Sequence, residues 1–268
     1  MQNDSRVEMR YIVALLVLWT TLVHAQPTME YELSLVGMNM DYKEHDENGV
    51  LLDSEKSQNM SDMMGAEMAY RYFLDSSTLI QLQYLGVEGT TEYIGAYLDS
   101  HQPYGSVVGI SNNEIRDIAL YYDKKKMNLS YVLMSGIGVG YRYWYRELSA
   151  TQAEFYRWYS LRAHIGFEYN INPVTIALLA EYQYGLFPTM TASDVSGKFK
   201  LGAADVMKFS LPVTYSLNSS FSLKFSYVYE IQKIKRSNTV YGSDGVPLVE
   251  PDSRANNQYL KIGFVFKY

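Results

Sequence analysis

The chain has 268 residues, with 23 Lys and Arg against 29 Asp and Glu, and it contains no Cys. The absence of Cys excludes a disulfide-stabilised scaffold, a thiolate metal site and a Cys nucleophile. A net charge of -6 without a basic cluster argues against a nucleic-acid partner. Hydrophobic residues make up 47% of the chain and 26 residues are Tyr, yet the mean hydropathy is only -0.18. Apolar and polar residues are therefore interleaved, which excludes a helical membrane bundle.

The N-terminal segment has the features of a secretory signal peptide. Arg6 and Arg10 precede the apolar run 11–23, and Ala25 ends a cleavage pattern before Gln26. The alternative is an uncleaved membrane anchor, but the run is shorter than the roughly 20 residues that a spanning helix needs. We therefore expect residues 1–25 to be a signal peptide and residues 26–268 to form the mature domain.

The mature chain alternates apolar and polar residues with a period of two, which predicts β-strands. Ten such segments are expected, near residues 29–42, 64–74, 78–88, 114–122, 136–146, 158–169, 176–184, 208–215, 221–232 and 260–268. Their connections differ in length. Tight turns are expected at 75–77, 123–125, 170–173 and 217–219, and long polar loops near 41–62, 89–113, 187–203 and 235–254, with a shorter connection at 147–153. Short turns at one end and long loops at the other predict an all-β, antiparallel, up-and-down transmembrane barrel.

Aromatic residues are expected to form a girdle at each membrane interface. Those near the periplasmic rim are Tyr70, Tyr72, Tyr122, Tyr131, Phe167, Tyr169, Tyr215, Phe221, Phe266 and Tyr268. Those near the outer rim are Tyr84, Tyr141, Tyr143, Tyr145, Tyr159, Tyr182, Tyr184, Tyr227 and Tyr229. The strand propensity of Tyr explains its abundance but not this placement at two ends.

The signal segment, the ten alternating strands and the last strand resemble those of Gram-negative outer-membrane β-barrel proteins. The last strand has apolar residues on one face and ends on an aromatic; they are Leu260, Ile262, Phe264, Phe266 and Tyr268. This ending is similar to the signal read by the barrel-assembly machinery. The resemblance implies an outer-membrane location with periplasmic termini, contact with lipid and lipopolysaccharide, and no cofactor. The likeness to omptins is one of size only.

The opposite face of the strands would line the lumen, and it carries six acids, seven bases and one histidine. They are Glu67, Arg71, Asp117, Arg142, Arg146, Glu154, Arg162, His164, Glu168, Glu181, Lys208, Lys224, Glu230 and Lys261. Because charges in a confined interior must be paired or hydrated, this near balance predicts a network of cross-strand ion pairs. Ten strands that also turn Tyr121, Trp144 and Trp158 inward should leave a closed or narrow lumen.

No complete catalytic constellation is found. His164 could act as an acid or base near neutral pH, but Ser160 is too far along the strand to form a nucleophile–base pair, and a hydrogen-bonded structural histidine is the simpler interpretation. Asp99-Ser100-His101 resembles the Asp-x-His pair of omptin proteases only weakly, because it lies in the second long loop and the chain has no Asp-x-Asp.

The first long loop is acidic, and two interpretations of it remain open. Its acids are Asp41, Glu44, Asp46, Glu47, Asp53, Glu55 and Asp62. They could gather oxygen ligands for a hard cation, but a solvated charged loop is the favoured interpretation. On the outer face, Arg157, Lys233 and Lys235 are candidate contacts for lipopolysaccharide phosphates, with snorkelling of basic side chains as the alternative.

For function, the sequence favours a non-enzymatic barrel with a structural or surface-binding role through its long loops. A narrow porin is the first alternative. An outer-membrane hydrolase, either an omptin-like protease or a lipid-modifying enzyme, is the second.

Overall fold

The computed structural model describes residues 29–95, 103–128, 130–150, 152–193, 195, 197–242 and 245–268. The expected signal peptide and the Asp99-Ser100-His101 motif lie outside the described residues. Within those ranges, no helix is long and apolar enough to cross a membrane.

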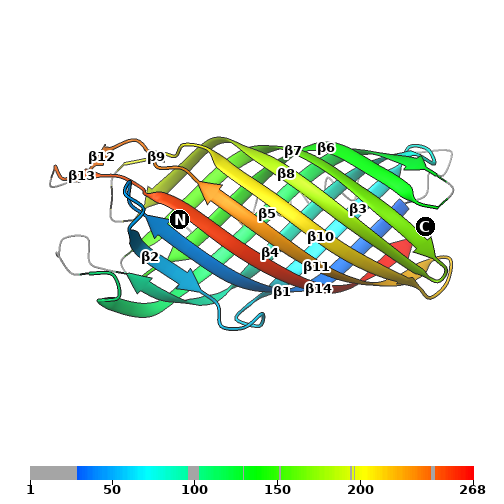
Figure 1. Ribbon diagram of the computed structural model, residues 1–268, viewed down its shortest axis with the longest axis horizontal. Coiled ribbons are helices and arrows are strands. Elements are labelled where there is room, and N and C mark those ends of the chain that lie inside the picture. Colours follow the sequence, from blue (N-terminus) through cyan, green and yellow to red (C-terminus); the bar gives the residue numbers. More distant parts are fainter. Residues whose placement is uncertain are drawn as a thin grey trace, which may run out of the picture.

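The described strands form one closed antiparallel barrel (Figure 1). Its wall consists of ten long strands: β1 (Met29–His45), β3 (Met63–Phe73), β4 (Thr78–Gly95), β5 (Val107–Met127), β6 (Val132–Glu147), β7 (Ala153–Ile171), β8 (Val174–Ala192), β10 (Ala204–Ser216), β11 (Phe221–Ile234) and β14 (Asp252–Lys267). Neighbours in this series are hydrogen-bonded to each other, and β1 closes the barrel by pairing with β14. The predicted ten-stranded barrel is therefore confirmed.

Four short strands extend the barrel at one end. They are β2 (Leu51–Lys56), β9 (Phe199–Lys200), β12 (Val240–Tyr241) and β13 (Pro247–Leu248). All four lie at the left of Figure 1, the end with the long connections, whereas the C-terminus and the tight turns lie at the right. We call these the long-loop end and the short-turn end.

An outward-facing apolar belt surrounds the barrel next to the short-turn end. On β1, Tyr31, Leu33 and Leu35 point outward and are exposed, at 41%, 55% and 70%. Further along the same strand, the outward positions become Asn39, Asp41 and Lys43. The barrel wall therefore continues beyond the apolar belt into a region that is polar on its outer surface.

This polar extension explains why the predicted strands were too short. β5 begins at Val107 rather than near 114, and half of the supposed acidic loop 41–62 is strand, in β1 and β2. Glu44 and Glu55 are buried in the lumen, so the interpretation of a solvated loop is wrong for them. On β1 and β2 the outer face beyond the belt is also polar, and the period-two contrast that marks a strand disappears there. The start of β5 differs, because Val108 and Ile110 are exposed on its outer face.

The tight turn expected at 123–125 is also misplaced. β5 continues to Met127, and the turn to β6 follows it. Asp123 points into the lumen, where its Oδ1 lies 3.3 Å from Nε2 of His164. A polar Asp-Lys-Lys sequence suggested a turn, although its alternate residues still face inward and outward as in a strand.

The last strand, β14, allows a test of which of its residues face outward and which face the lumen. Phe264 and Phe266 are exposed on the apolar belt, whereas Lys267 lines the lumen. Tyr268 exchanges two backbone hydrogen bonds of 2.8 Å with Met29. Deleting Tyr268 is expected to lower the level of folded barrel in the outer membrane sharply, because both barrel closure and the aromatic ending are lost.

Lys267→Ala is the matched control and is expected to leave that level unchanged. Quantitative blotting of outer-membrane fractions, with the heat-dependent gel shift reporting folding, measures both variants. Equal amounts of folded barrel in the Tyr268 deletion and in Lys267→Ala would contradict the proposed role of this strand in barrel closure and assembly.

Candidate functional site

The ionisable side chains inside the barrel form three groups along its axis. The lower tier, nearest the short-turn end, consists of Glu30, Glu32, Glu67, Arg71, Lys224 and Lys261. The middle tier consists of Asp117, Glu181, Glu230, Arg142, Arg162 and Lys208. The upper tier, towards the long-loop end, consists of Glu44, Asp53, Glu55, Glu154, Glu250 and Arg146.

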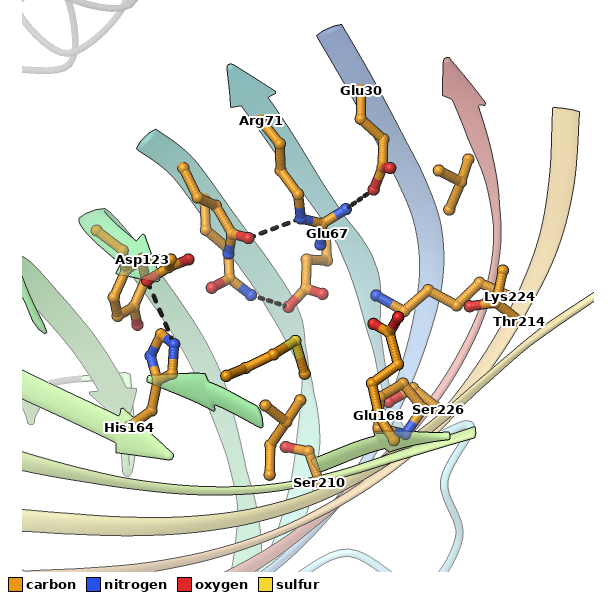
Figure 2. A pocket seen from close by; sticks show the side chains of 18 of the residues that line it. Glu30, Glu67, Arg71, Asp123, His164, Glu168, Ser210, Thr214, Lys224 and Ser226 are labelled. Carbon is orange, nitrogen blue, oxygen red and sulfur yellow. Dashed lines mark hydrogen bonds and ion pairs between the residues drawn. The ribbon is translucent and has the colours of Figure 1, made fainter. Parts of the chain in front are cut away.

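The lower tier borders a cavity. Arg71 binds Glu30 and, at 2.8 Å, Glu32, while Lys224 Nζ lies 2.7 Å from the same Glu32 carboxylate. Apart from Glu32, the side chains of this tier line the cavity, which has a volume of about 370 Å³ and reaches from the short-turn end to the middle of the barrel (Figure 2). Every acid of this tier has a basic partner, so the cavity wall is polar and close to neutral.

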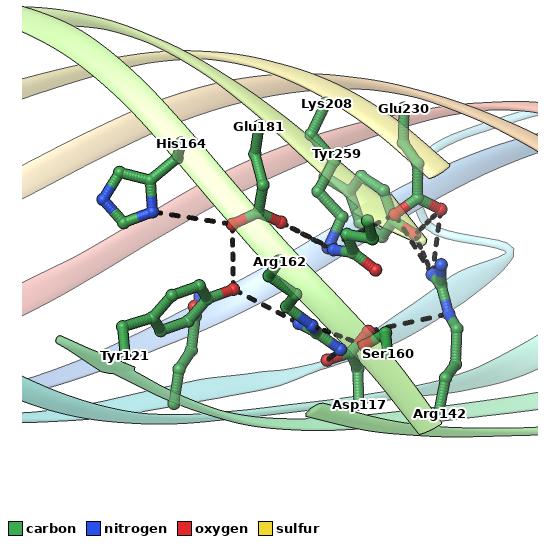
Figure 3. Close-up of polar contacts among 12 residues, drawn as sticks. Asp117, Tyr121, Arg142, Ser160, Arg162, His164, Glu181, Lys208, Glu230 and Tyr259 are labelled. Atoms are coloured by element: carbon green, nitrogen blue, oxygen red, sulfur yellow. Dashed lines mark hydrogen bonds and ion pairs between the residues drawn. The ribbon is translucent and has the colours of Figure 1, made fainter. Parts of the chain in front are cut away.

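The middle tier closes the lumen. Arg142 on β6 reaches across the barrel to Glu230 on β11, with Nη2 at 2.8 Å from Oε1 and 3.1 Å from Oε2 (Figure 3). Asp117 lies between Arg142 and Arg162 and forms an ion pair with the latter, Oδ1 being 2.8 Å from Nη2. Tyr259 donates to Glu230 at 3.1 Å. Arg142 and Glu230 are both fully buried, so no open channel passes between them.

Aromatic side chains and glycines complete this closure. Trp158 is 1% exposed and lies beneath the Arg142 guanidinium, 5.9 Å from ring centroid to Cζ. A Cβ atom at Gly140 would lie 2.3 Å from the guanidinium of Arg162. Glycine on the lumen face of β6 therefore gives space to a large neighbour.

His164 and Ser160 do not form a catalytic pair. Nε2 of His164 faces Asp123 at 3.3 Å and Nδ1 faces Glu181 at 4.0 Å, as Figures 2 and 3 show. Ser160 Oγ instead accepts a hydrogen bond of 2.8 Å from Arg162. This is the arrangement of a structural histidine between two carboxylates.

The upper tier has a single cation at its centre. Arg146 is completely buried and lies 2.7–2.8 Å from the carboxylates of Glu44, Glu55 and Glu154. Its guanidinium also packs over the ring of Tyr42, at 4.3 Å from the centroid. Three carboxylates from three different strands therefore share one guanidinium.

Burial dominates the acid–base properties of this tier, which lies beyond the apolar belt. Desolvation raises the pKa of Glu154 to about 7, although the charge of Arg146 acts to lower it. The nearby Glu44 carboxylate contributes to this rise. Burial likewise raises the pKa of Glu250 and that of Asp53 well above their usual range, in both cases with Glu44 as a contributing neighbour. These three groups therefore retain protons at pH values where carboxyls are normally ionised.

The oxygens of Glu44, Glu154 and Glu250 lie within 4.8 Å of one another. They already accept hydrogen bonds from Arg146, from Tyr42 and from Tyr156. Because these donors occupy the oxygens, we assign no metal ion to the cluster.

All the lumen residues expected from the sequence point inward, and the structure distributes them over the three tiers, with Glu168 and His164 on the cavity wall. Arg157, Lys233 and Lys235 are exposed on the outer surface. Sequence reasoning missed Glu30 and Glu32, although both alternate with outward apolar residues of β1. It also missed Glu250, which carries no periodic signal.

The Arg142–Glu230 pair predicts a large effect on stability. Arg142→Ala leaves Glu230 buried without its closest cation, which is expected to lower the free energy of unfolding by about 3 kcal/mol. Arg157→Ala, on the exposed surface, is the control and should change it by less than about 1 kcal/mol. Urea unfolding in lipid vesicles, followed by Trp fluorescence, measures both values.

Replacing both partners, Arg142→Met with Glu230→Gln, should cost less than Arg142→Ala alone, because no charge is left unpaired. Equal losses in Arg142→Ala and Arg157→Ala would show that the pair does not support the barrel.

The chain matches no protein-family model and no curated protein sequence. Among solved structures it is similar to the outer-membrane protease OmpT from Escherichia coli, with a TM-score of 0.60, 11% identity and coverage of 93% of this chain and 100% of that one. The translocator domain of the autotransporter NalP from Neisseria meningitidis gives a TM-score of 0.43 at 9% identity, with coverage of 98% of this chain and 96% of that one. The outer membrane protein OprG from Pseudomonas aeruginosa gives a TM-score of 0.41 at 10% identity, with coverage of 91% of this chain and 97% of that one.

These similarities concern the fold, because identities near 10% leave no basis for transferring a site. The closed antiparallel wall, the outward apolar belt and the polar lumen are features of transmembrane β-barrels. The chain therefore has the fold of the Gram-negative outer-membrane β-barrel proteins.

Proposed function

We propose that the protein is a closed, non-enzymatic outer-membrane barrel with a structural or surface-binding role, exercised through its long-loop end. The observation that carries this proposal is the buried Arg142–Glu230 pair, which spans the lumen between β6 and β11. A barrel that is closed at its middle does not serve as a continuous water-filled passage. The parts of the wall left for interaction are then those that rise above the apolar belt.

The proposed orientation follows from the same asymmetry. Bacterial barrels have short periplasmic turns and longer extracellular loops. The tight turns and the C-terminus share one end of this barrel, and β2, β9, β12 and β13 lie at the other. We therefore infer that the short-turn end and both termini face the periplasm.

The narrow-porin and hydrolase alternatives have weaker support. The cavity of about 370 Å³ ends at the middle tier rather than crossing it. Ser160 is bonded to Arg162 and His164 lies against carboxylates, so these residues offer no activated nucleophile.

Lipopolysaccharide is the partner that the outer surface fits best. Lys43, Arg254 and Lys233 lie directly opposite one another on the neighbouring strands β1, β14 and β11, and all three are exposed. Like charges placed opposite each other on a sheet repel, and a phosphate between them would remove that repulsion. Lys235, which follows β11 on the outer surface, would add to the same contact, whereas Arg157 on β7 would form a separate contact at another part of the wall.

The closed lumen predicts a silent protein in planar bilayers. The folded barrel is expected to give no steady single-channel steps. The double variant Arg142→Ala with Glu230→Ala should enlarge the lower cavity and still give no such steps, because the buried side chains of Tyr42, Trp144 and Tyr156 fill the lumen beyond it. Arg157→Ala should remain silent. Steady steps from the unaltered protein would support the porin alternative instead.

The basic row predicts binding of phosphorylated lipid A. Lys233→Ala with Arg254→Ala should weaken the binding of lipopolysaccharide about tenfold or more, since two charge-assisted contacts are lost. Lys124→Ala and Lys126→Ala, at the short-turn end, are the control. Calorimetry with intact and with dephosphorylated lipopolysaccharide measures the difference, and equal binding of the two lipids would contradict a phosphate contact.

A further inference from the structure

The three tiers differ in their balance of charge. The lower and middle tiers each pair three acids with three bases, whereas the upper tier places five carboxyls around Arg146. Uncompensated charge in a buried site is costly. The described upper tier therefore requires a further source of positive charge, or carboxyls that are neutral.

Hydrogen-bond geometry indicates where protons lie. The Tyr156 hydroxyl contacts Glu250 Oε1 through a short hydrogen bond and Glu154 Oε2 at 3.0 Å. A phenol has one proton to donate, so only one of these contacts can use it. The other contact is a hydrogen bond only if one carboxyl carries a proton, in agreement with the raised pKa values of Glu154 and Glu250.

Glu250 differs from the other upper-tier acids because it does not belong to the barrel wall. It lies in the connection between β11 and β14, of which residues 235–242 and 245–251 are described; we call these residues the latch. Val240 and Leu248 of the latch pack against the buried core. Glu250 joins the latch to β7 through Tyr156, and its carbonyl accepts from Ser237 N at 3.0 Å.

Two exposed ion pairs lie at the outer edge of the latch. Arg236 contacts Glu47 at 2.8 Å and Lys235 contacts Asp252 at 3.7 Å, all four side chains being 44–71% exposed. Such pairs contribute little to stability.

The base of the latch is fixed by backbone hydrogen bonds to β9 and the β9–β10 connection, from Lys235 N to Ala203 O at 2.8 Å and from Asn238 N to Lys200 O at 3.1 Å. Beyond Asn238, the described contacts with the barrel are the buried contact of Glu250 and the apolar contacts of Val240 and Leu248, so this outer part of the latch is the part that can be released.

We propose that the outer part of the latch is proton-dependent: protons shared between Glu154 and Glu250 around the Tyr156 hydroxyl hold it against the barrel, and their loss releases it. The inference does not rest on the function proposed above, and the latch would act in a pore, an enzyme or a surface protein alike. It would make the long-loop end of the barrel responsive to the pH of its surroundings.

The direction of the pH dependence of latch closure follows from proton linkage. The carboxyls bind protons more tightly with the latch closed than when it is open and solvated, so closure is favoured at low pH and weakens as pH rises through about 7, the value for Glu154. The groups that face the site are Tyr42 and Glu44 on β1, Asp53 and Glu55 on β2, Tyr93 on β4, Arg146 on β6, and Glu154 and Tyr156 on β7. Arg146 is the single cation among them and stays charged throughout.

The absence of Cys from the sequence allows a direct test with single introduced cysteines. Leu248→Cys reports on the inner side of the latch, and Val108→Cys, on the exposed face of β5, corrects for the pH dependence of thiol chemistry. The ratio of their labelling rates with a bulky maleimide should rise about tenfold between about pH 6 and about pH 8, as expected for release of at least one proton.

In Glu154→Gln and in Glu250→Gln the ratio should stay constant over this range, because the amide is neutral at every pH. Glu92→Gln removes an exposed acid of β4 outside the cluster and should retain the rise. The heat-dependent gel shift shows that each variant is folded, and Glu44→Gln replaces any variant that is not.

Two outcomes would overturn the proposal. One is a constant ratio in the unaltered background, or a rise that persists in the Gln variants. The other is a ratio that falls with added Ca²⁺ and rises with a chelator equally at both pH values, which would mean that a cation, and not protons, neutralises the cluster.

Discussion

Compensation of charge inside a narrow tube is the constraint on which this structure depends. The outer wall needs only apolar residues at alternate positions, but the inner positions carry charges that no single strand can satisfy. Glu230 shows the solution, because its partners Arg142, Lys208, Asn257 and Tyr259 come from β6, β10 and β14. Each such contact fixes the distance between strands, so the lumen network holds the wall in register as well as neutralising itself.

The sequence was sufficient for those features that repeat along a strand. Alternation in the last strand and in β7 predicted the apolar belt and the inward position of Arg162 and His164. It was not sufficient where both faces are polar: Glu55 stands in a strand whose outer residues are as hydrophilic as its inner ones, so it was interpreted as part of a solvated loop. Nor does any local pattern show that Arg142 meets Glu230, because the two lie 88 positions apart.

The tiers also indicate which end of the molecule is free to change. Paired charges in the middle tier are buried and come from strands that are hydrogen-bonded on both sides, so their separation is fixed by the wall. In the upper tier, Glu250 is supplied by a connection whose outer part pairs with itself, β12 with β13, and whose base alone is hydrogen-bonded to the neighbouring connection at 200–203. Structural rigidity and adjustable chemistry are therefore separated along one axis.

The closure at Arg142 and Glu230 has a consequence for how the inside of the barrel meets its surroundings. It marks the inner end of the cavity that opens at the short-turn end, because the described lumen beyond it is filled by buried side chains such as Tyr42, Trp144 and Tyr156. Water, ions and small reagents that enter the cavity lined by Arg71 and Lys224 must leave by the mouth through which they came. Side chains only a few residues apart on β6 or β7 can thus belong to chemically separate environments, and the protein can respond on one side of the membrane while its other side remains unaffected.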